Sequence, residues 1–171
     1  MKTIQPEHFS DDDSYEYYAD KLARTGCLTP AEHYVFAHFV PFDWDEMAVA
    51  EHYLRHLCRA ARSGYVHALY QLSFVLEYGD YGAAKDVALA RRLMDICARK
   101  QHPNAIFHAA WQARDEAERR RLILLAARKR SQAAYLYLAD CHAKGRDGFR
   151  QNRRLAMFYK KLAWADGTWT V

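Results

Sequence analysis

Residues 66–98 read VHALYQLSFVLEYGDYGAAKDVALARRLMDICA, and residues 132–164 read QAAYLYLADCHAKGRDGFRQNRRLAMFYKKLAW. A shift of 66 positions aligns the two stretches without a gap, and the matched pairs are Gly79 with Gly145, Gly82 with Gly148, Asp86 with Asn152 and Ala90 with Ala156. A shift of 37 also places Ala61 on Ala98 and Ala68 on Ala105. Self-similarity at these periods predicts a repeat protein.

Each repeat has the pattern of a helical hairpin. Ala68, Leu72, Val75 and Leu76 recur at spacings of three, four and seven, which is typical of one buried helix face. Gly79 is placed to end that helix, and Asp86 is placed to cap the next one. Alanine at equivalent positions indicates close helix crossings, because two helices approach closely only where side chains are small.

The hairpin pattern extends along the chain and predicts an all-α fold, a right-handed α/α superhelix (solenoid) in a single domain over residues 1–171. The expected parts are an N-terminal helix at about 13–25 and hairpins at about 30–62, 67–100, 103–129 and 132–166. We expect Gly167–Val171 to be a short apolar flap. Only seven Gly and four Pro, with no alternating Val, Ile and Thr, argue against a β-sandwich or barrel.

The motif Ala68-x-x-x-Leu72 … Gly79-x-x-Gly82-x-x-x-Asp86-x-x-x-Ala90 resembles the Sel-one-like repeat, a relative of the tetratricopeptide repeat, and its copy at 134–159 resembles it again. The middle repeat lacks the glycine loop, and Phe36 stands where the first repeat would have a small residue. The resemblance implies a superhelical stack that acts as an adaptor or scaffold without catalysis or cofactor.

Composition agrees with an ordinary folded chain. The 171 residues are 51% apolar and 27% charged, which excludes wholesale disorder. The N-terminus has no secretory pattern, and no segment has the roughly 18 apolar residues of a membrane span. We therefore expect a cytoplasmic protein in which the four cysteines (27, 58, 97 and 141) are reduced and mostly buried.

The charges are unevenly distributed. Residues 1–56 carry a net charge of −7, and residues 57–171 carry +11. This asymmetry either steers a partner of opposite polarity or reflects ordinary solvated helix faces. Arg119–Arg121 and two further basic clusters could bind phosphates, but Glu118 can pair with Arg121 and no nucleic-acid motif is present. We favour a solvated basic face over nucleic-acid binding.

Two histidines have a spacing that metals use. His52 and His56 lie four residues apart on an expected helix, as in zinc sites, but no third ligand is expected to converge on them. We interpret them as surface or interface histidines and expect no metal. The cysteines, Cys58 and Cys97 among them, lack the nearby base that a nucleophile needs, so we expect no catalysis.

Aromatic residues suggest where a partner would bind. In tetratricopeptide-like stacks the first helix of each hairpin lines the concave face, which would place Tyr70, Phe74, Phe107 and Trp111 in one strip. The same register adds Arg114, Leu136 and Asp140 to this face. Buried aromatic anchors within a polar rim are typical of interface hot spots. The alternative is that these rings pack within the protein itself.

These observations favour a non-enzymatic module that binds another protein. The sharpest hypothesis is a small bacterial immunity or antitoxin protein that covers one toxin domain. The rival is a regulatory scaffold or chaperone-like adaptor with several weaker ligands, and nucleic-acid or metal binding is a distant alternative. The sequence leaves the oligomeric state open.

Overall fold

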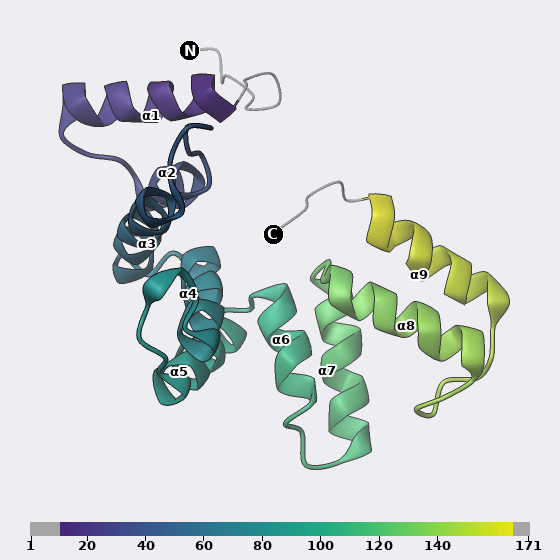
Figure 1. Ribbon diagram of the computed structural model, residues 1–171. Coiled ribbons are helices and arrows are strands. Elements are labelled where there is room, and N and C mark those ends of the chain that lie inside the picture. The colour runs from purple at the N-terminus through teal and green to yellow at the C-terminus, as the bar shows by residue number, and fades with distance from the viewer. Residues whose placement is uncertain (1–10, 166–171) are drawn as a thin grey trace. The chain divides into compact units, whose positions relative to one another are not determined.

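The computed structural model describes residues 11–165, with side chains from Ser14 onward, and this part of the chain is helical and contains no strand (Figure 1). The helices are α1 (Asp11–Thr25), α2 (Pro30–Ala37), α3 (Glu46–Arg62), α4 (Val66–Tyr78), α5 (Val87–Arg99), α6 (Pro103–Ala110), α7 (Glu116–Arg128), α8 (Gln132–Lys144) and α9 (Arg153–Ala165), with a 3₁₀ turn η2 (Asp80–Gly82). The predicted all-α class is confirmed. The expected flap Gly167–Val171 lies outside the described residues.

The chain divides into two compact units, Met1–Met94 and Asp95–Val171, and the boundary falls inside α5. In the N-terminal unit α1 packs on α2, α2 on α3, and α3 on α4. In the C-terminal unit α6 packs on α7, α8 on α9, and α8 also contacts both α6 and α7. That residues 1–171 form one domain stays a prediction.

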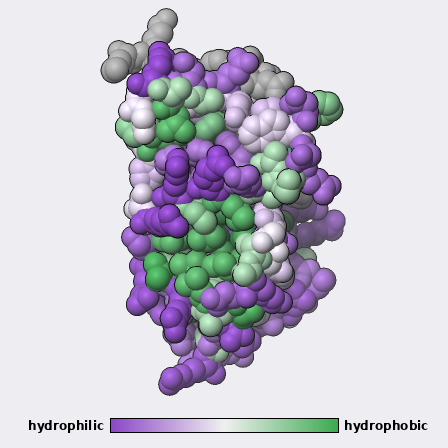
Figure 2. Space-filling view, turned by 60° about the vertical axis from the view of Figure 1, so that its left-hand side comes forward, coloured by the Kyte–Doolittle hydropathy of each residue, from purple (hydrophilic) through white to green (hydrophobic). Residues whose placement is uncertain are grey.

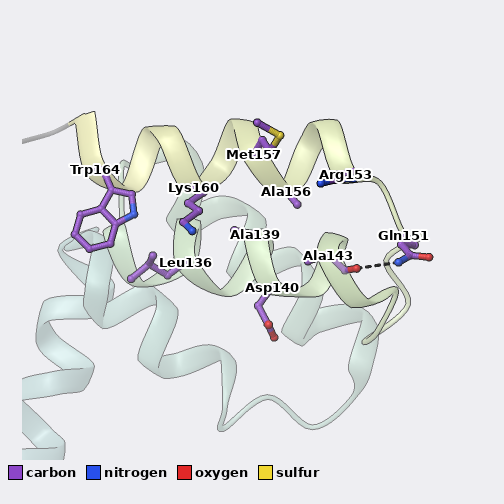
Figure 3. Close-up of a pocket in the computed structure, with 10 residues that line it drawn as sticks. All are labelled: Leu136, Ala139, Asp140, Ala143, Gln151, Arg153, Ala156, Met157, Lys160 and Trp164. Atoms are coloured by element: carbon purple, nitrogen blue, oxygen red, sulfur yellow. Dashed lines mark hydrogen bonds between the residues drawn. The ribbon is translucent and has the colours of Figure 1, made fainter.

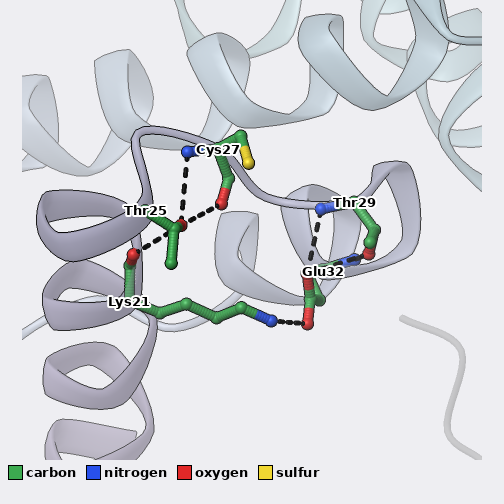
Figure 4. Close-up of polar contacts among 5 residues, drawn as sticks. All are labelled: Lys21, Thr25, Cys27, Thr29 and Glu32. Carbon is green, nitrogen blue, oxygen red and sulfur yellow. Dashed lines mark hydrogen bonds and ion pairs between the residues drawn. The ribbon is translucent and has the colours of Figure 1, made fainter.

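The start of α2 is fixed by a capping box, which also joins it to α1. The Thr29 hydroxyl accepts from the Glu32 backbone N–H at 3.2 Å, and the Glu32 carboxylate accepts from the Thr29 backbone N–H at 2.9 Å. The same carboxylate forms an ion pair with Lys21 of α1 (Figure 4). Glu32 therefore caps one helix and holds a second one against it.

Aromatic and imidazole rings fill the core of the N-terminal unit. The ring centroid of Phe36 lies 4.5 Å from that of His56, 4.7 Å from that of His52 and 5.3 Å from that of Tyr15. His52 also bonds the Phe36 carbonyl oxygen at 2.8 Å, and His33 and His56 approach each other at 2.9 Å between their Nδ1 atoms. These contacts cross-link α1, α2 and α3.

The interpretation of His52 and His56 as surface residues is wrong. Both are buried, because the aromatic rings of α1 and α2 cover the face of α3 on which they lie. Burial lowers the pKa of His56 to about 3, and the charges of His52, His33 and Arg59 act in the same direction. The two imidazoles are therefore held neutral as core side chains.

Alanine and larger aliphatic side chains form the core of the C-terminal unit. A cluster of buried side chains there comprises Ile106, Ala110, Ile123, Ala126, Ala127, Ala134, Tyr135, Leu138 and Ala163. Ala134 is fully buried, as its repeat equivalent Ala68 is in the N-terminal unit. The predicted burial of both alanines is confirmed.

The glycine positions also match the prediction. Gly79 and Gly145 end α4 and α8 in the left-handed conformation, with φ of 80° and 68°. The side chains of Asp86 and Asn152 then accept from the backbone N–H groups of Leu89 and Leu155 and cap the next helices.

Among the cysteines the prediction is correct for Cys97 and Cys141, which are buried, and wrong for Cys27, which is exposed in the turn before α2.

Candidate protein-binding surfaces

A ladder of aromatic rings runs along α4. Tyr70, Phe74 and Tyr78 recur every four residues, with ring centroids 5.0 Å apart for the first pair and 6.4 Å for the second. Tyr70 and Phe74 are half-buried, whereas Tyr78 is exposed. The row of three rings therefore lies partly on the surface of the N-terminal unit, with Tyr78 the most exposed of the three.

A second aromatic group lies on α6 and α8. The ring of Trp111 meets those of Phe107 and Tyr137 edge-on, with centroids 5.8 Å and 5.1 Å away, and the Arg119 guanidinium lies 5.8 Å from the Trp111 ring. Trp111 nevertheless keeps 46% of its surface exposed. A large aromatic side chain is thus held in place by three neighbours while it stays accessible.

Trp111 differs from its predicted place inside a helix. α6 has only eight residues and ends at Ala110, and Trp111 is its C-cap, where its backbone N–H donates to the carbonyl oxygen of His108 at 3.1 Å. Because the helix stops there, the indole projects from a turn instead of from a helix face.

Charged side chains border this aromatic group. The Tyr137 hydroxyl donates to Asp147 at 2.7 Å, and the Arg146 guanidinium lies 5.9 Å from the Tyr137 ring. Asp140 forms ion pairs with Arg146 and with Lys144, the latter at 2.7 Å, and its hydrogen bond to Lys144 lowers the pKa of its carboxyl. Burial of Tyr137 and its bond to Asp147 raise the pKa of its hydroxyl. The rim is therefore a connected set of ionised groups.

A groove of about 610 Å³ lies along the surface of the packed pair α8 and α9. Its lining residues are Leu136, Ala139, Asp140, Ala143, Gln151, Arg153, Ala156, Met157, Lys160 and Trp164. Trp164 and Leu136 lie at one end, and Arg153 and Gln151 lie at the other (Figure 3). Only Leu136 and Asp140 of this lining are among the residues predicted to contact a partner, although the helical spacing of Arg153, Met157, Lys160 and Trp164 in the sequence also indicates a shared face.

The structure joins the predicted residues in pairs. Tyr70 contacts Phe74 in the N-terminal unit, and Phe107 contacts Trp111 in the C-terminal unit. Arg114 is exposed in the turn after α6. One continuous strip through both pairs stays a prediction, because it would join the two units.

Large apolar side chains are exposed both within the surfaces described above and outside them. On the face drawn in Figure 2 an apolar area is bordered by hydrophilic residues. The most exposed large apolar side chains are Phe42, Met47, Met157, Tyr78, Trp164 and Phe158. Exposed apolar groups within a charged surface are typical of protein-binding sites.

Metal-binding groups and membrane-spanning helices are absent from residues 11–165. No group of three or more His, Cys, Asp or Glu side chains in this part of the chain is placed to hold a metal ion. None of the helices described there is long and apolar enough to cross a membrane.

Comparison with known proteins identifies the fold. No family model matches the chain, and no curated protein matches it. Two crystal structures are similar over nearly the whole chain. A Sel1 repeat protein from Oxalobacter formigenes has a TM-score of 0.62 and 21% identity over 94% of this chain. A protective antigen of uropathogenic Escherichia coli strains, displaying an SLR fold, has a TM-score of 0.56 and 20% identity over 90% of this chain.

The fold is that of the Sel-one-like repeat proteins. The chain spans 33% of the length of the Escherichia coli protein and 47% of that from Oxalobacter formigenes. The resemblance found in the sequence is thereby confirmed at the level of the fold. In a Sel-one-like stack each hairpin packs on the next, and contacts of α8 with α6 and α7 in the C-terminal unit follow this rule.

Proposed function

We propose that this Sel-one-like repeat protein is a non-enzymatic module that binds another protein in the cytoplasm. Its contact residues are Tyr70 and Phe74 in the N-terminal unit and Phe107, Trp111, Arg114, Leu136 and Asp140 in the C-terminal unit. The observation that carries the proposal is that the Trp111 side chain is both accessible and ordered: 46% of its surface is exposed, and Phe107, Tyr137 and Arg119 hold its ring in place. A pre-ordered aromatic side chain loses little conformational entropy when a partner covers it.

Our finer proposal is that the partner is a toxin domain and the protein is its immunity protein or antitoxin. The separation of charge, −7 in residues 1–56 and +11 in residues 57–171, supports rapid association with one partner of complementary polarity.

A regulatory scaffold or chaperone-like adaptor is the second candidate. It is favoured by the apolar surfaces on both units, the α4 ladder and the α8–α9 groove, because several ligands need several surfaces. Nucleic-acid binding is less favoured, because Glu116 and Glu118 form ion pairs with Arg120 and Arg121 of the first basic cluster.

The test compares the wild-type protein with Trp111→Ala. Partners captured from the native lysate are identified by mass spectrometry, and the affinity of the purified partner is then measured for both proteins. We expect Trp111→Ala to lose about 2 kcal/mol of binding free energy, about thirtyfold in Kd, mainly through faster dissociation. In the immunity version, cells carrying Trp111→Ala lose protection against the toxin although the folded protein accumulates.

Two controls make the test decisive. Phe158→Ala removes an exposed ring of α9 that does not line the groove, and it should leave the affinity unchanged. Circular dichroism and the melting temperature must show that Trp111→Ala is folded. A folded Trp111→Ala protein with wild-type affinity would remove Trp111 from the interface.

A further inference from the structure

The α8–α9 groove corresponds to a surface that is covered one hairpin earlier. Ala110 on α6 is the repeat equivalent of Ala139, and Ile123 and Ala127 on α7 are the equivalents of Lys160 and Trp164. Ala110, Ile123 and Ala127 are buried in one cluster with Ala134, Tyr135 and Leu138 of α8. In the C-terminal unit this surface is therefore where the next helix of the stack packs, whereas no helix within residues 11–165 covers its counterpart on α8 and α9.

The lining of the groove suits a helix. Ala139, Ala143 and Ala156 form a floor of small side chains that lets a helix approach closely. Leu136, Met157 and Trp164 rise beside it with 43%, 67% and 60% of their surfaces exposed. The lining residues of α9 extend from Arg153 to Trp164, about 16 Å along the helix axis, which is the length of three helical turns.

The charge of the groove specifies the kind of helix. Arg153 and Lys160 line it, and neither forms an ion pair with any residue that the structure describes. Asp140 is already paired with Lys144 and Arg146, so the free charges in the groove are positive. Lys160 also replaces the buried Ile123 of the preceding hairpin, so a docked helix meets a cation here where α8 meets an apolar side chain, and a carboxylate on that helix complements it.

We propose that the groove between α8 and α9 binds an acidic amphipathic α-helix of about three turns from a partner protein. The apolar stripe of that helix packs on Leu136, Met157 and Trp164, and its carboxylates pair with Arg153 and Lys160. The inference shares with the proposed function the premise that the partner is a protein, and Leu136 and Asp140 belong to both surfaces. A second copy docked groove to groove is disfavoured, because it would bring Arg153 and Lys160 against their own counterparts.

The experiment uses the full chain and a fluorescein-labelled, alanine-based helical peptide of about four turns. The peptide carries Leu at every third or fourth position and Glu on both flanks of that stripe, and a second peptide carries Lys in place of Glu. Fluorescence anisotropy at low salt measures both affinities. We expect the Glu peptide to bind at least about tenfold more tightly than the Lys peptide, since the exposed cations Arg153 and Lys160 attract carboxylates and repel ammonium groups at low salt.

Three variants locate the binding site. Lys160→Glu should reverse the preference between the two peptides, and Trp164→Ala should weaken the Glu peptide about tenfold. Lys161→Glu is the matched control, because Lys161 is adjacent and exposed and does not line the groove, and it should change the affinity by less than about twofold. Circular dichroism confirms that all three variants are folded.

Several results would overturn the inference. Failure of the Glu peptide to bind the wild-type protein would show that the groove is not a helix-binding site. Equal losses of affinity in Lys160→Glu and Lys161→Glu would show that the peptide binds a general basic surface and not the groove. A dimer that Lys160→Glu dissociates would make the occupant a second copy. Binding that appears only after removal of residues 166–171 would make it the chain's own end. Trp111→Ala should leave peptide binding intact, so failure here and failure of the proposed aromatic interface are distinguishable.

Discussion

The loop Gly79–Gly82 in the N-terminal unit and the loop Gly145–Gly148 in the C-terminal unit have nearly the same backbone. The φ angles are 80° and 68° at the first glycine, 56° at Tyr81 and 54° at Asp147, and 73° and 72° at the last glycine. After each loop a backbone N–H, of Asp86 in one and Asn152 in the other, bonds a carbonyl oxygen of the preceding helix at 2.8 Å.

The side chains between the glycines differ completely. Tyr81 stacks on Tyr53 of α3, with ring centroids 4.3 Å apart. Asp147, at the equivalent position, accepts from the Tyr137 hydroxyl and from the Cys141 thiol and lies beside Arg146. The glycine spacing therefore sets the path of the chain, and the residues within it are available for either core packing or a polar surface.

The same contrast holds for the two cores. The N-terminal unit packs Phe36 against buried histidines, whereas the C-terminal unit packs alanine and leucine around Ile123. Both units use fully buried alanines at their helix crossings. Each of the following experiments tests whether a given property belongs to the shared repeat or to one unit alone.

Acid should destabilise the N-terminal unit most. The pKa of His56 is about 3 in the folded protein and 6.5 ordinarily, so between these values the unfolded chain binds the extra proton. The free energy of unfolding is therefore highest above pH 6.5 and falls as the pH drops, by up to about 1.4 kcal/mol per pH unit for this histidine. Urea unfolding at pH 7.5 and pH 5 should show a loss of about 2 kcal/mol.

The variant His56→Gln isolates this contribution. It removes the titrating group from the cluster of His33, His52, Arg55 and Arg59 and should flatten the dependence on pH. Two-dimensional NMR during acidification should show the native peaks of α3 disappearing before those of α8. An unchanged pH slope in His56→Gln would contradict the assignment.

Enlarging the crossing alanines should affect both units. Ala68→Leu and Ala134→Leu each place three extra carbons in a fully buried site, which should cost about 1–3 kcal/mol by chemical denaturation. Ala88→Leu, at an exposed position of α5, is the control and should be nearly neutral. Tolerance of the larger residue at only one of the two sites would show that the repeats do not share their packing.

Substituting the first loop glycines should cost more in the C-terminal unit. A Cβ on Gly145 would lie 3.2 Å from the Gln151 Cβ and 3.3 Å from its backbone nitrogen, whereas a Cβ on Gly79 would find nothing closer than 3.4 Å. Both alanine variants carry the strain of positive φ, about 1 kcal/mol. Gly26→Ala, with φ of 70° and no atom within 4 Å of the added carbon, measures that strain alone. Equal melting temperatures for all three variants would contradict the difference.

The smallest expected effect concerns the polar rim of the second loop. Tyr137→Phe removes the 2.7 Å bond to Asp147 and leaves the ring against Trp111, so unfolding should become easier by about 1 kcal/mol. Tyr135→Phe, in the core of the same unit, is the control and should cost less. If both variants are neutral, the bond to Asp147 orders the surface without stabilising the fold.

Sequence alone predicts the features that depend on size or backbone angle. Ala68 and Ala134 are recognisable because only small side chains fit a helix crossing, and Gly79 and Gly145 because positive φ favours glycine. The burial of His52 was missed because it depends on Tyr15 and Phe36, which lie far away in the sequence. The spacing of residues within one helix carries no information about which side chains of other helices bury that helix.

In the candidate surfaces, too, contacts between residues close in sequence are predictable, whereas contacts between helices are not. The contact of Phe107 with Trp111 follows from their spacing of four residues, but Tyr137 and Arg119 come from other helices, and the position of Trp111 depends on where α6 stops. The groove was not predicted: Leu136 and Asp140 were expected on the face that carries the aromatic residues, and the second wall of the groove depends on how α9 lies against α8.

Packing between neighbouring hairpins also bears on how such a protein changes over generations. Within the C-terminal unit α8 packs on α6, α7 and α9, and each of these contacts joins segments close in sequence. Duplication or loss of a hairpin then alters one junction and leaves distant residues untouched. Selection can therefore lengthen or shorten the chain in whole hairpins while the residues between the loop glycines diversify toward new ligands.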